Sequence, residues 1–199
     1  MLATTTRLGP ADHGRTMNLE EFIDADFTEG YRYELGRGSL IVNEVANPPH
    51  FHQVQAIIEQ LVLYKVAHPG IIQSLGGGGE TRLDIEQLDS SRHADVVVYK
   101  TPAPSRDRDC WSIWIPELVV EVVSSTSINR DYHEKPDEYL QFGVQEYWIL
   151  DADRTEMLVH RRIGGRWKTH LVKPPELHTT HILPGLPFSC EAVFVAAAK

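Results

Sequence analysis

The chain has 199 residues, of which 42% are hydrophobic and 24% are charged, a balance that is ordinary for a globular protein and excludes wholesale disorder. Asp and Glu number 28 against 19 Lys and Arg, so the formal net charge is −9 with His neutral. This acidic balance argues against a surface that coats nucleic acid or an anionic membrane through bulk charge, although it leaves room for a local basic strip.

The cysteines and the apolar runs indicate the compartment. Cys110 and Cys190 stand far apart and no CxxC pair occurs, so we expect two buried thiols in a reducing compartment rather than a disulfide framework or a zinc ribbon. The first sixteen residues lack the apolar stretch of a signal peptide, and no eighteen apolar residues run together. We therefore expect a cytoplasmic protein that makes no use of a membrane.

The first quarter of the chain indicates an arm, a short helix and a hairpin. Residues 1–16 are polar and mixed, and we expect a flexible arm there, ahead of a single domain over residues 17–199. Asn18 followed by Glu21 resembles a capping box and predicts a short helix. Residues 33–45, with glycines between two apolar runs, are typical of a β-hairpin.

The rest of the chain alternates between helix and strand patterns. An apolar stripe over residues 54–62 predicts the clearest helix, and a second helix is expected from about Asp131 to Phe142. The order helix, three strands, helix, strand indicates an α/β protein with a mixed sheet. The expected strands are 71–75, 81–85, 94–99, 117–123, 146–151, 157–162 and 166–172.

Two of the expected strands carry a carboxylate among apolar residues, namely Asp95 and Glu121. An ionised carboxylate inside a buried strand costs several kcal/mol unless a partner compensates it. Consecutive strands are usually neighbours, so the two acids would repel each other unless a cation, a lysine or a shared proton lies between them. The alternative is that both acids cap strand ends that face water.

A divalent metal suits this pair best, because Mg²⁺ is commonly held by one or two carboxylates together with waters and substrate phosphate. Lys135 follows on the next helix and could supply a compensating ammonium. Pro136 comes directly after it, and a residue before proline is biased away from helical geometry, although proline fits in a first helical turn. The direction in which Lys135 points is therefore open at this stage.

Six motifs follow one another between residues 18 and 185, and together they resemble the Uma-two family of restriction-endonuclease-like proteins in the PD-(D/E)XK nuclease superfamily. The resemblance implies an α/β fold with an αβββαβ core around a mixed central sheet, to which an N-terminal helix and hairpin and a C-terminal β-hairpin are added. The motifs are Tyr33-Glu34-Leu35 with Gly38, His52-Gln53, Ala94-Asp95-Val96-Val97-Val98, Pro116-Glu117-Leu118-Val119-Val120-Glu121-Val122-Val123-Ser124, Arg130-Asp131 with Glu134-Lys135 and Tyr139, and Gly143-Val144-Gln145-Glu146-Tyr147-Trp148 with Asp151.

The resemblance also implies a magnesium-dependent phosphodiesterase site, in which Mn²⁺ could substitute. Asp95 matches the first metal-binding acid and Glu121 the second, and the backbone carbonyl of Val122 would be a further ligand. Glu34 matches an acidic position beside the site. Lys135 matches the family's catalytic lysine, which would orient or deprotonate the attacking water or neutralise the phosphate.

Three other features are weaker. His52 opens the long helix and matches the family's His-Gln pair, so it is a candidate neighbour of the site. Glycines 76–79 lack the Lys-Ser/Thr of a phosphate-binding loop and predict a flexible hairpin loop near the site. The hydroxyl residues 124–127 lack the context of a serine nucleophile, and we expect them to serve the loop after Glu121.

Residues 154–173 hold six basic side chains and one acid, a local net charge of +5 inside an acidic protein. Arg161, Arg162, Arg166 and Lys168 are candidate contacts to a nucleic-acid backbone. The alternative for this stretch is a solvated hairpin face or a contact between subunits.

Two functions are consistent with these patterns. The first is a magnesium-dependent endonuclease that hydrolyses DNA with a metal-activated water, needs no organic cofactor and forms a homodimer to cut two strands. The second is a catalytically silent module that keeps the nuclease fold and acts through protein partners. The presence of both acids and the lysine favours the first.

Overall fold

The structure is a computed structural model that describes residues 7–198. The helices are α1 (Leu19–Ile23), α2 (Pro48–Ala67), α3 (Lys135–Phe142) and α4 (Cys190–Ala196). The strands of a large sheet are β5 (Ser74–Gly76), β8 (Val96–Tyr99), β9 (Leu118–Val122), β10 (Glu146–Asp151), β11 (Glu156–Ile163) and β12 (Arg166–Val172). The strands of a small sheet are β3 (Arg32–Gly36), β4 (Ser39–Asn43), β6 (Leu83–Ile85) and β7 (Ser90–Arg92). Two short pairs are β1 (Arg7–Leu8) with β2 (Asp26–Phe27), and β13 (Leu177–His178) with β14 (Phe188–Ser189).

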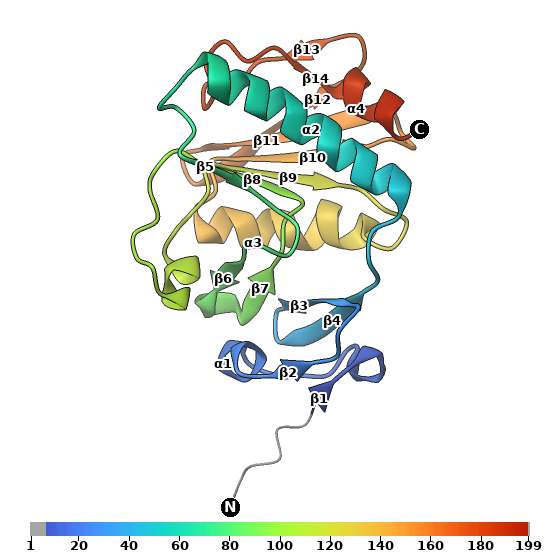
Figure 1. The fold of residues 1–199 in the computed structure, drawn as a ribbon, viewed down its shortest axis with the longest axis vertical. Coiled ribbons are helices and arrows are strands. Elements are labelled where there is room, and N and C mark those ends of the chain that lie inside the picture. Colours follow the sequence, from blue (N-terminus) through green and yellow to red (C-terminus); the bar gives the residue numbers. More distant parts are fainter. Residues whose placement is uncertain (1–6, 199) are drawn as a thin grey trace, which may run out of the picture.

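The large sheet lies at the centre of the molecule, with the strand order β12-β11-β10-β9-β8-β5 (Figure 1). Its strands β9 and β10 run parallel, whereas the other neighbouring pairs run antiparallel. The elements α2, β5, β8, β9, α3 and β10 follow one another along the chain in the αβββαβ order. The expected α/β core with a mixed central sheet is therefore confirmed, as is the C-terminal hairpin formed by β11 and β12.

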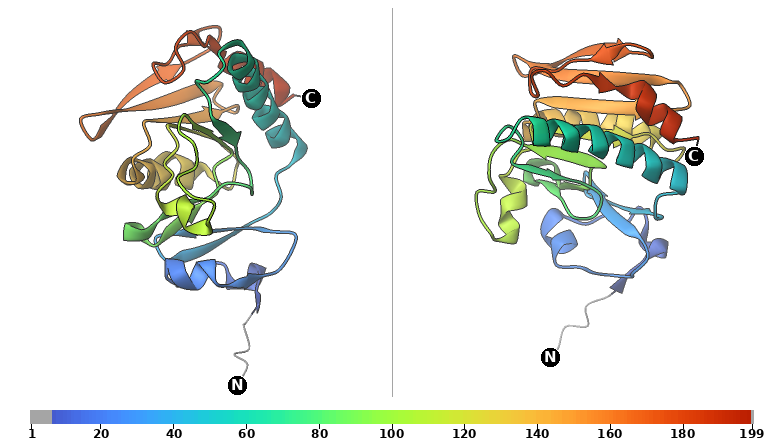
Figure 2. Two further views of the ribbon diagram at one scale, coloured as in Figure 1. Left: turned by 60° about the vertical axis from the view of Figure 1, so that its left-hand side comes forward. Right: turned by 45° about the horizontal axis from the view of Figure 1, so that its top comes forward.

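Helices cover both faces of the large sheet, as Figure 2 shows, with α2 and α4 on one face and α3 on the other. On the first face, Val120 of β9 belongs to the same buried cluster as Ile57 and Leu61 of α2. On the second face, Val119 belongs to the cluster that contains Tyr139 of α3. Because both faces are buried, these strands are nearly continuous apolar runs, and a charged residue within them stands out.

The structure differs from the expected flexible arm over residues 7–16. Strand β1 pairs in parallel with β2, and the side chain of Leu8 is buried in the N-terminal apolar cluster. The backbone N–H of Gly14 donates to the carbonyl of Leu40 at 2.7 Å. This segment therefore packs against β4, and the part of the arm over residues 1–6 lies outside the described residues.

The glycine run 76–79 forms a different connection from the expected hairpin loop. It leads from β5 in the large sheet to β6 in the small sheet, so the two flanking strands do not pair with each other. The N–H of Gly78 donates to the carbonyl of Ala94 at 2.9 Å. A Cβ on Gly77 would lie 2.0 Å from the backbone oxygen of Asp95, so only glycine permits this close approach.

None of the helices in residues 7–198 combines the length and the apolar character needed to cross a lipid bilayer.

Candidate active site

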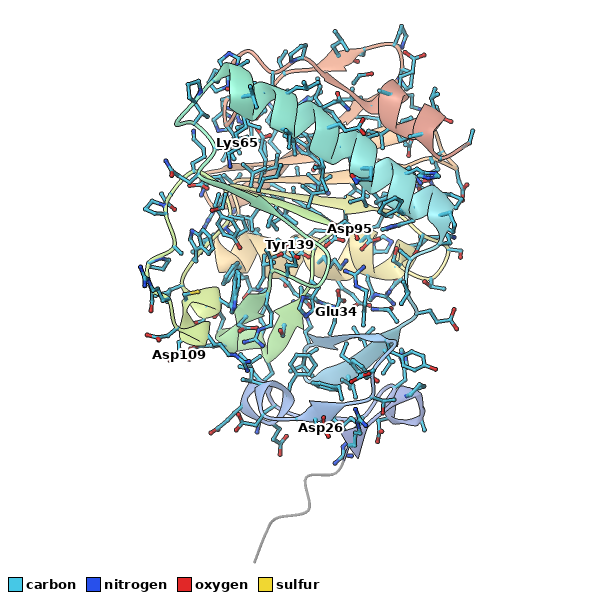
Figure 3. All side chains as sticks on the ribbon, viewed as in Figure 1. Asp26, Glu34, Lys65, Asp95, Asp109 and Tyr139 are labelled. Atoms are coloured by element: carbon cyan, nitrogen blue, oxygen red, sulfur yellow. The ribbon has the colours of Figure 1, made fainter. Side chains whose placement is uncertain are left out.

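A cavity of about 470 Å³ opens at the end of the large sheet where β8 begins and β9 ends. Its walls come from the large sheet, the small sheet, the start of α2 and the loop that leads into α3. Figure 3 labels Asp95, Glu34 and Tyr139, which approach this region from the large sheet, from the small sheet and from α3. The charged and titratable side chains that line the cavity are Arg32, Glu34, Glu44, His50, His93, Asp95, Glu121, Arg130, Asp131 and Lys135.

Asp95 stands directly before β8, and the residue is only 7% exposed. Its Oδ2 accepts a hydrogen bond from the backbone N–H of Val122 at 2.9 Å and lies 3.2 Å from Nε2 of His50. Burial would raise the pKa of Asp95, but the contacts with His50, the charge of Lys135 and the Val122 N–H outweigh it and lower the pKa. Asp95 is therefore held as a carboxylate.

Glu121 lies within β9 and is only 2% exposed. Its Oε1 accepts a hydrogen bond from the Tyr139 hydroxyl at 2.6 Å and lies 3.0 Å from Nζ of Lys135. Burial, together with the negative charges of Asp95 and Asp131, raises the pKa of Glu121 to about 8 in spite of the lysine. Glu121 therefore differs from Asp95, whose pKa is lowered.

The chain accommodates Pro136 with a wide turn before α3. Residues 130–134 form a π-helical turn, in which the N–H of Lys135 donates to the carbonyl of Arg130 five residues earlier. Because a proline ring crowds the carbonyl four residues before it, this wider turn lets Pro136 occupy the first turn of α3. Lys135 keeps helical geometry and directs Nζ into the cavity, which answers the question that the sequence left open.

Asp131 is a site residue that the sequence analysis did not single out. It is buried, and its Oδ1 lies 2.8 Å from Nζ of Lys135. Apart from this ion pair, neither carboxylate oxygen has a hydrogen-bond partner among the described residues. Burial lowers the pKa of Lys135, but Asp131 and Glu121 outweigh it and raise the pKa. The spacing of four residues between an acid and a lysine on a helix was the available signal.

Glu34 of β3 lines the cavity and is held from behind by a buried arginine. Nη1 of Arg92 lies 3.4 Å from Glu34, and the N–H of His93 donates to Oε1 of Glu34 at 3.3 Å. Arg92 also forms two hydrogen bonds to Glu138 of α3, at 2.7 and 2.9 Å. Burial would raise the pKa of Glu34, but Lys135 and Arg92 lower it. The sequence analysis did not identify Arg92.

His52 does not line the cavity, whereas His50 of the same helix does, together with His93. Asn47 caps α2 by accepting a hydrogen bond from the His50 N–H, so the helix begins at Pro48. Residues two positions apart on a helix point in directions that differ by about 200°. The expectation for His52 is therefore corrected to His50, which contacts Asp95.

The basic hairpin lies at the other end of the large sheet. Arg161 of β11 pairs with Glu146, which in turn pairs with Leu118 at the start of β9, whereas Glu121 stands near the end of that strand. None of the four basic residues of the hairpin is among the described residues that line the cavity. They are therefore not placed to contact a phosphate bound in the cavity. These four residues are Arg161, Arg162, Arg166 and Lys168.

The cavity offers a small set of hard oxygen ligands. Within residues 7–198, no three His, Cys, Asp or Glu side chains converge as a metal-binding group. Asp95 contacts His50 and Val122 through Oδ2, and Glu121 contacts Tyr139 and Lys135 through Oε1. Oδ1 of Asp95 and Oε2 of Glu121 therefore accept no hydrogen bond from the described residues. Two carboxylates with waters and substrate phosphate fit the requirements of Mg²⁺.

Comparisons with known proteins show the family and agree with the fold. Residues 19–191 match the profile of the Uma2 (Uma-two) family, which is described as "putative restriction endonuclease". A crystal structure of a putative nuclease belonging to DUF820, from Anabaena variabilis, superposes with a TM-score of 0.69 at 19% sequence identity. The superposition covers 91% of this chain and 99% of that chain, and at this identity it shows a shared fold. No curated protein sequence is similar enough to count as a relative.

Proposed function

Because the chain belongs to the Uma2 family of restriction-endonuclease-like proteins, we propose that it is a magnesium-dependent endonuclease that hydrolyses DNA phosphodiester bonds. One observation carries the proposal: Asp95, Glu121 and Lys135 line the same cavity, and Nζ of Lys135 lies 3.0 Å from Glu121. Buried charged groups reduce the stability of a protein, so their presence in a cavity favours a functional role. Ionisable groups with shifted pKa values in a cleft are typical of functional sites.

The proposed metal ligands are Oδ1 of Asp95 and Oε2 of Glu121, which accept no hydrogen bond from the described residues, with the carbonyl of Val122 as a further ligand. When bound, Mg²⁺ or its substitute Mn²⁺ lowers the pKa of a coordinated water and offsets the charge that develops on the phosphate. Burial and the neighbouring carboxylates raise the pKa of Glu121, and a bound cation would lower it.

The chain's own residues fix the positions of these groups. His50 and the Val122 N–H hold Asp95, and the Tyr139 hydroxyl holds Glu121. Lys135 is held between Glu121 and Asp131, at 3.0 and 2.8 Å. Fixed in this way, the ammonium acts as a localised positive charge that orients the attacking water or neutralises a phosphate oxygen.

Two arginines could bind the incoming phosphate group. Arg32 and Arg130 line the cavity, and neither lies on the basic hairpin. Nη1 of Arg32 lies 3.9 Å from Oδ1 of Asp95, and Nη2 of Arg130 donates to the Asn43 side chain at 2.9 Å. A guanidinium held by a neighbour in this way presents its remaining N–H groups to a phosphate at little entropic cost.

The Asp95→Asn variant tests the proposal. We expect it to lose cleavage of plasmid DNA under Mg²⁺, because one of two metal-binding carboxylates becomes a neutral amide. Asp153→Asn, at an exposed position in the turn after β10, is the matched control and should cleave like the parent. If Asp95→Asn cleaves as well as the parent, the activity does not come from this cavity.

Calorimetry with Mg²⁺ and Mn²⁺ distinguishes the nuclease from a catalytically silent module of the same fold. We expect the parent to take up metal and Asp95→Asn to take up much less. Absence of both uptake and cleavage in the parent would favour the silent module. The homodimer, the cytoplasmic location and the single domain over residues 17–199 stay predictions.

A further inference from the structure

A second cavity, of about 380 Å³, lies beside the first. It is bounded by α1, by β2 and β3, and by Arg108 of the 3-10 turn Arg108–Ser112, which is the yellow-green coil next to β6 in Figure 1. Nothing in the proposed hydrolysis uses it. Its aromatic and positively charged lining consists mainly of Phe22, Phe27, Tyr31, Tyr33, Arg82 and Arg108.

Packing explains only part of the aromatic lining. Phe22 and Tyr33 are buried in the N-terminal apolar cluster, where they serve as core residues. Tyr31 is 40% exposed, and its ring centre lies 6.5 Å from that of Tyr33. Phe27 is half-buried and stacks on Tyr33 with 4.4 Å between ring centres. Tyr31 and Phe27 are thus aromatic rings at a cavity wall that the core does not fully cover.

The charges of this cavity are of one sign. Arg82 and Arg108 line it together with Arg32, and no acidic residue is among the described residues that do so. Arg82 is held in place by Asp84, at 2.8 Å, whereas Arg108 is exposed on the 3-10 turn. Aromatic faces next to arginines are the combination that proteins use to bind the bases and phosphates of single-stranded nucleic acid.

The two cavities share a wall. Arg32 and His93 line both of them. The guanidinium of Arg32 lies 3.9 Å from Oδ1 of Asp95 on one side, and it donates to the carbonyls of Gly78 and His93, at 3.3 and 3.5 Å. Arg32 therefore lies at the boundary between the two cavities, within reach of a phosphate in either one.

We infer that the second cavity binds an unpaired nucleotide of the strand being cut, with its base against Tyr31 and Phe27 and its phosphate near Arg32 and Arg108. A base inside a duplex is paired and stacked, so it cannot enter an aromatic cavity without leaving the helix. The substrate class is accordingly single-stranded nucleic acid, or duplex with an unpaired end or a flipped base. This inference rests on the proposed nuclease function for the identity of the ligand.

Binding without cleavage tests the inference. We would measure the Kd of a labelled single-stranded oligonucleotide and of a duplex of the same sequence in EDTA, where a magnesium enzyme does not cut. The single strand should bind more tightly. Tyr31→Ala should weaken single-strand binding by about 5- to 150-fold, the range expected for the loss of one base–aromatic stack. Tyr31→Phe keeps the ring and should bind like the parent.

Arg108→Ala provides an independent test of the phosphate contact. It should weaken single-strand binding and reduce the slope of log Kd against log salt by about 0.7, the value for one phosphate contact on a single strand. Arg106→Ala, at an exposed position of the same loop outside the cavity lining, should change neither quantity. Thermal unfolding of each variant shows whether it is folded.

The outcomes separate this inference from the nuclease proposal. If Tyr31→Ala binds the single strand as tightly as the parent, or if duplex binding falls by the same factor, the inference is wrong. Cleavage under Mg²⁺ is measured on the same proteins. Tyr31-dependent binding by a parent that never cuts supports this inference and contradicts the nuclease. Cleavage that requires Asp95, without any Tyr31-dependent binding, supports the nuclease and contradicts this inference.

Discussion

The first cavity and the hairpin formed by β11 and β12 both concentrate charge, and they lie at opposite ends of the same sheet. In the cavity, Glu121 and Lys135 are 2% and 4% exposed and are paired with each other. On the hairpin, Arg161 and Arg166 are exposed. Buried charges are costly unless they are paired, whereas exposed charges are screened and contribute little. The burial of charged side chains therefore distinguishes the candidate site from the hairpin. The number of like charges in a segment does not.

Among the variants that test this comparison, Lys135→Met should change stability and cleavage the most. It leaves Glu121 and Asp131 buried without their shared ammonium, and breaking a buried ion pair from one side costs about 3–5 kcal/mol. We expect this loss in the free energy of urea unfolding without divalent metal, together with loss of cleavage. Lys168→Met makes the same change on the hairpin and should alter stability by less than about 0.5 kcal/mol.

The double variant Lys135→Met with Asp131→Asn sharpens this test. Removing the second charge should recover part of the lost stability, because one unpaired buried carboxylate then becomes a neutral amide. If Lys135→Met is as stable as Lys168→Met, the difference between the two regions does not lie in burial.

Gly77→Ala should have an intermediate effect. Its new Cβ would lie 2.0 Å from the carbonyl oxygen of Asp95, so the backbone at this acid has to move. Forcing a side chain into such a space typically costs about 1–3 kcal/mol. We expect reduced stability and reduced cleavage. Gly79→Ala is the matched control, because nothing lies within 4 Å of its Cβ. Equal stability and cleavage for the two variants would contradict the close approach.

The smallest effect is expected from the hairpin itself. Arg166→Gln combined with Lys168→Gln should change the cleavage rate by less than about twofold at moderate salt, because exposed charges far from the phosphate are screened. Plasmid cleavage at two salt concentrations measures this. A loss above about tenfold would mean that the substrate runs along the hairpin and would remove the distinction between the two regions.

The sequence predicted best where the information was local. Strand β10 has the bounds that its apolar run indicated, over residues 146–151. Asp95 and Glu121 were recognisable because an acid is rare in an apolar strand that is covered on both faces. The capping box of Asn18 with Glu21 forms as expected and begins α1.

What the sequence could not show depends on partners that are distant along the chain. Strand β7 has only three residues, Ser90–Arg92, and pairs with β3 and β6, so it lacks a detectable alternation. The glycine run 76–79 looked like a hairpin because the flanking strands are close in sequence, but their partners lie in two different sheets. Arg92 is the last residue of β7, so its contacts with Glu34 and Glu138 depend on how that strand pairs. No local pattern in the sequence predicts these contacts.

Arg92 determines how freely the walls of the cavity can move. Its guanidinium binds Glu34 on the small sheet and Glu138 on α3, and it is fully buried. Any separation of the small sheet from α3 would strand these charges in an apolar setting, a change that costs several kcal/mol. The Glu34 wall and the Lys135 wall therefore move as one rigid body. The charged groups on these two walls are therefore fixed relative to one another, and the loops over residues 44–47 and 124–127 complete the lining of the cavity.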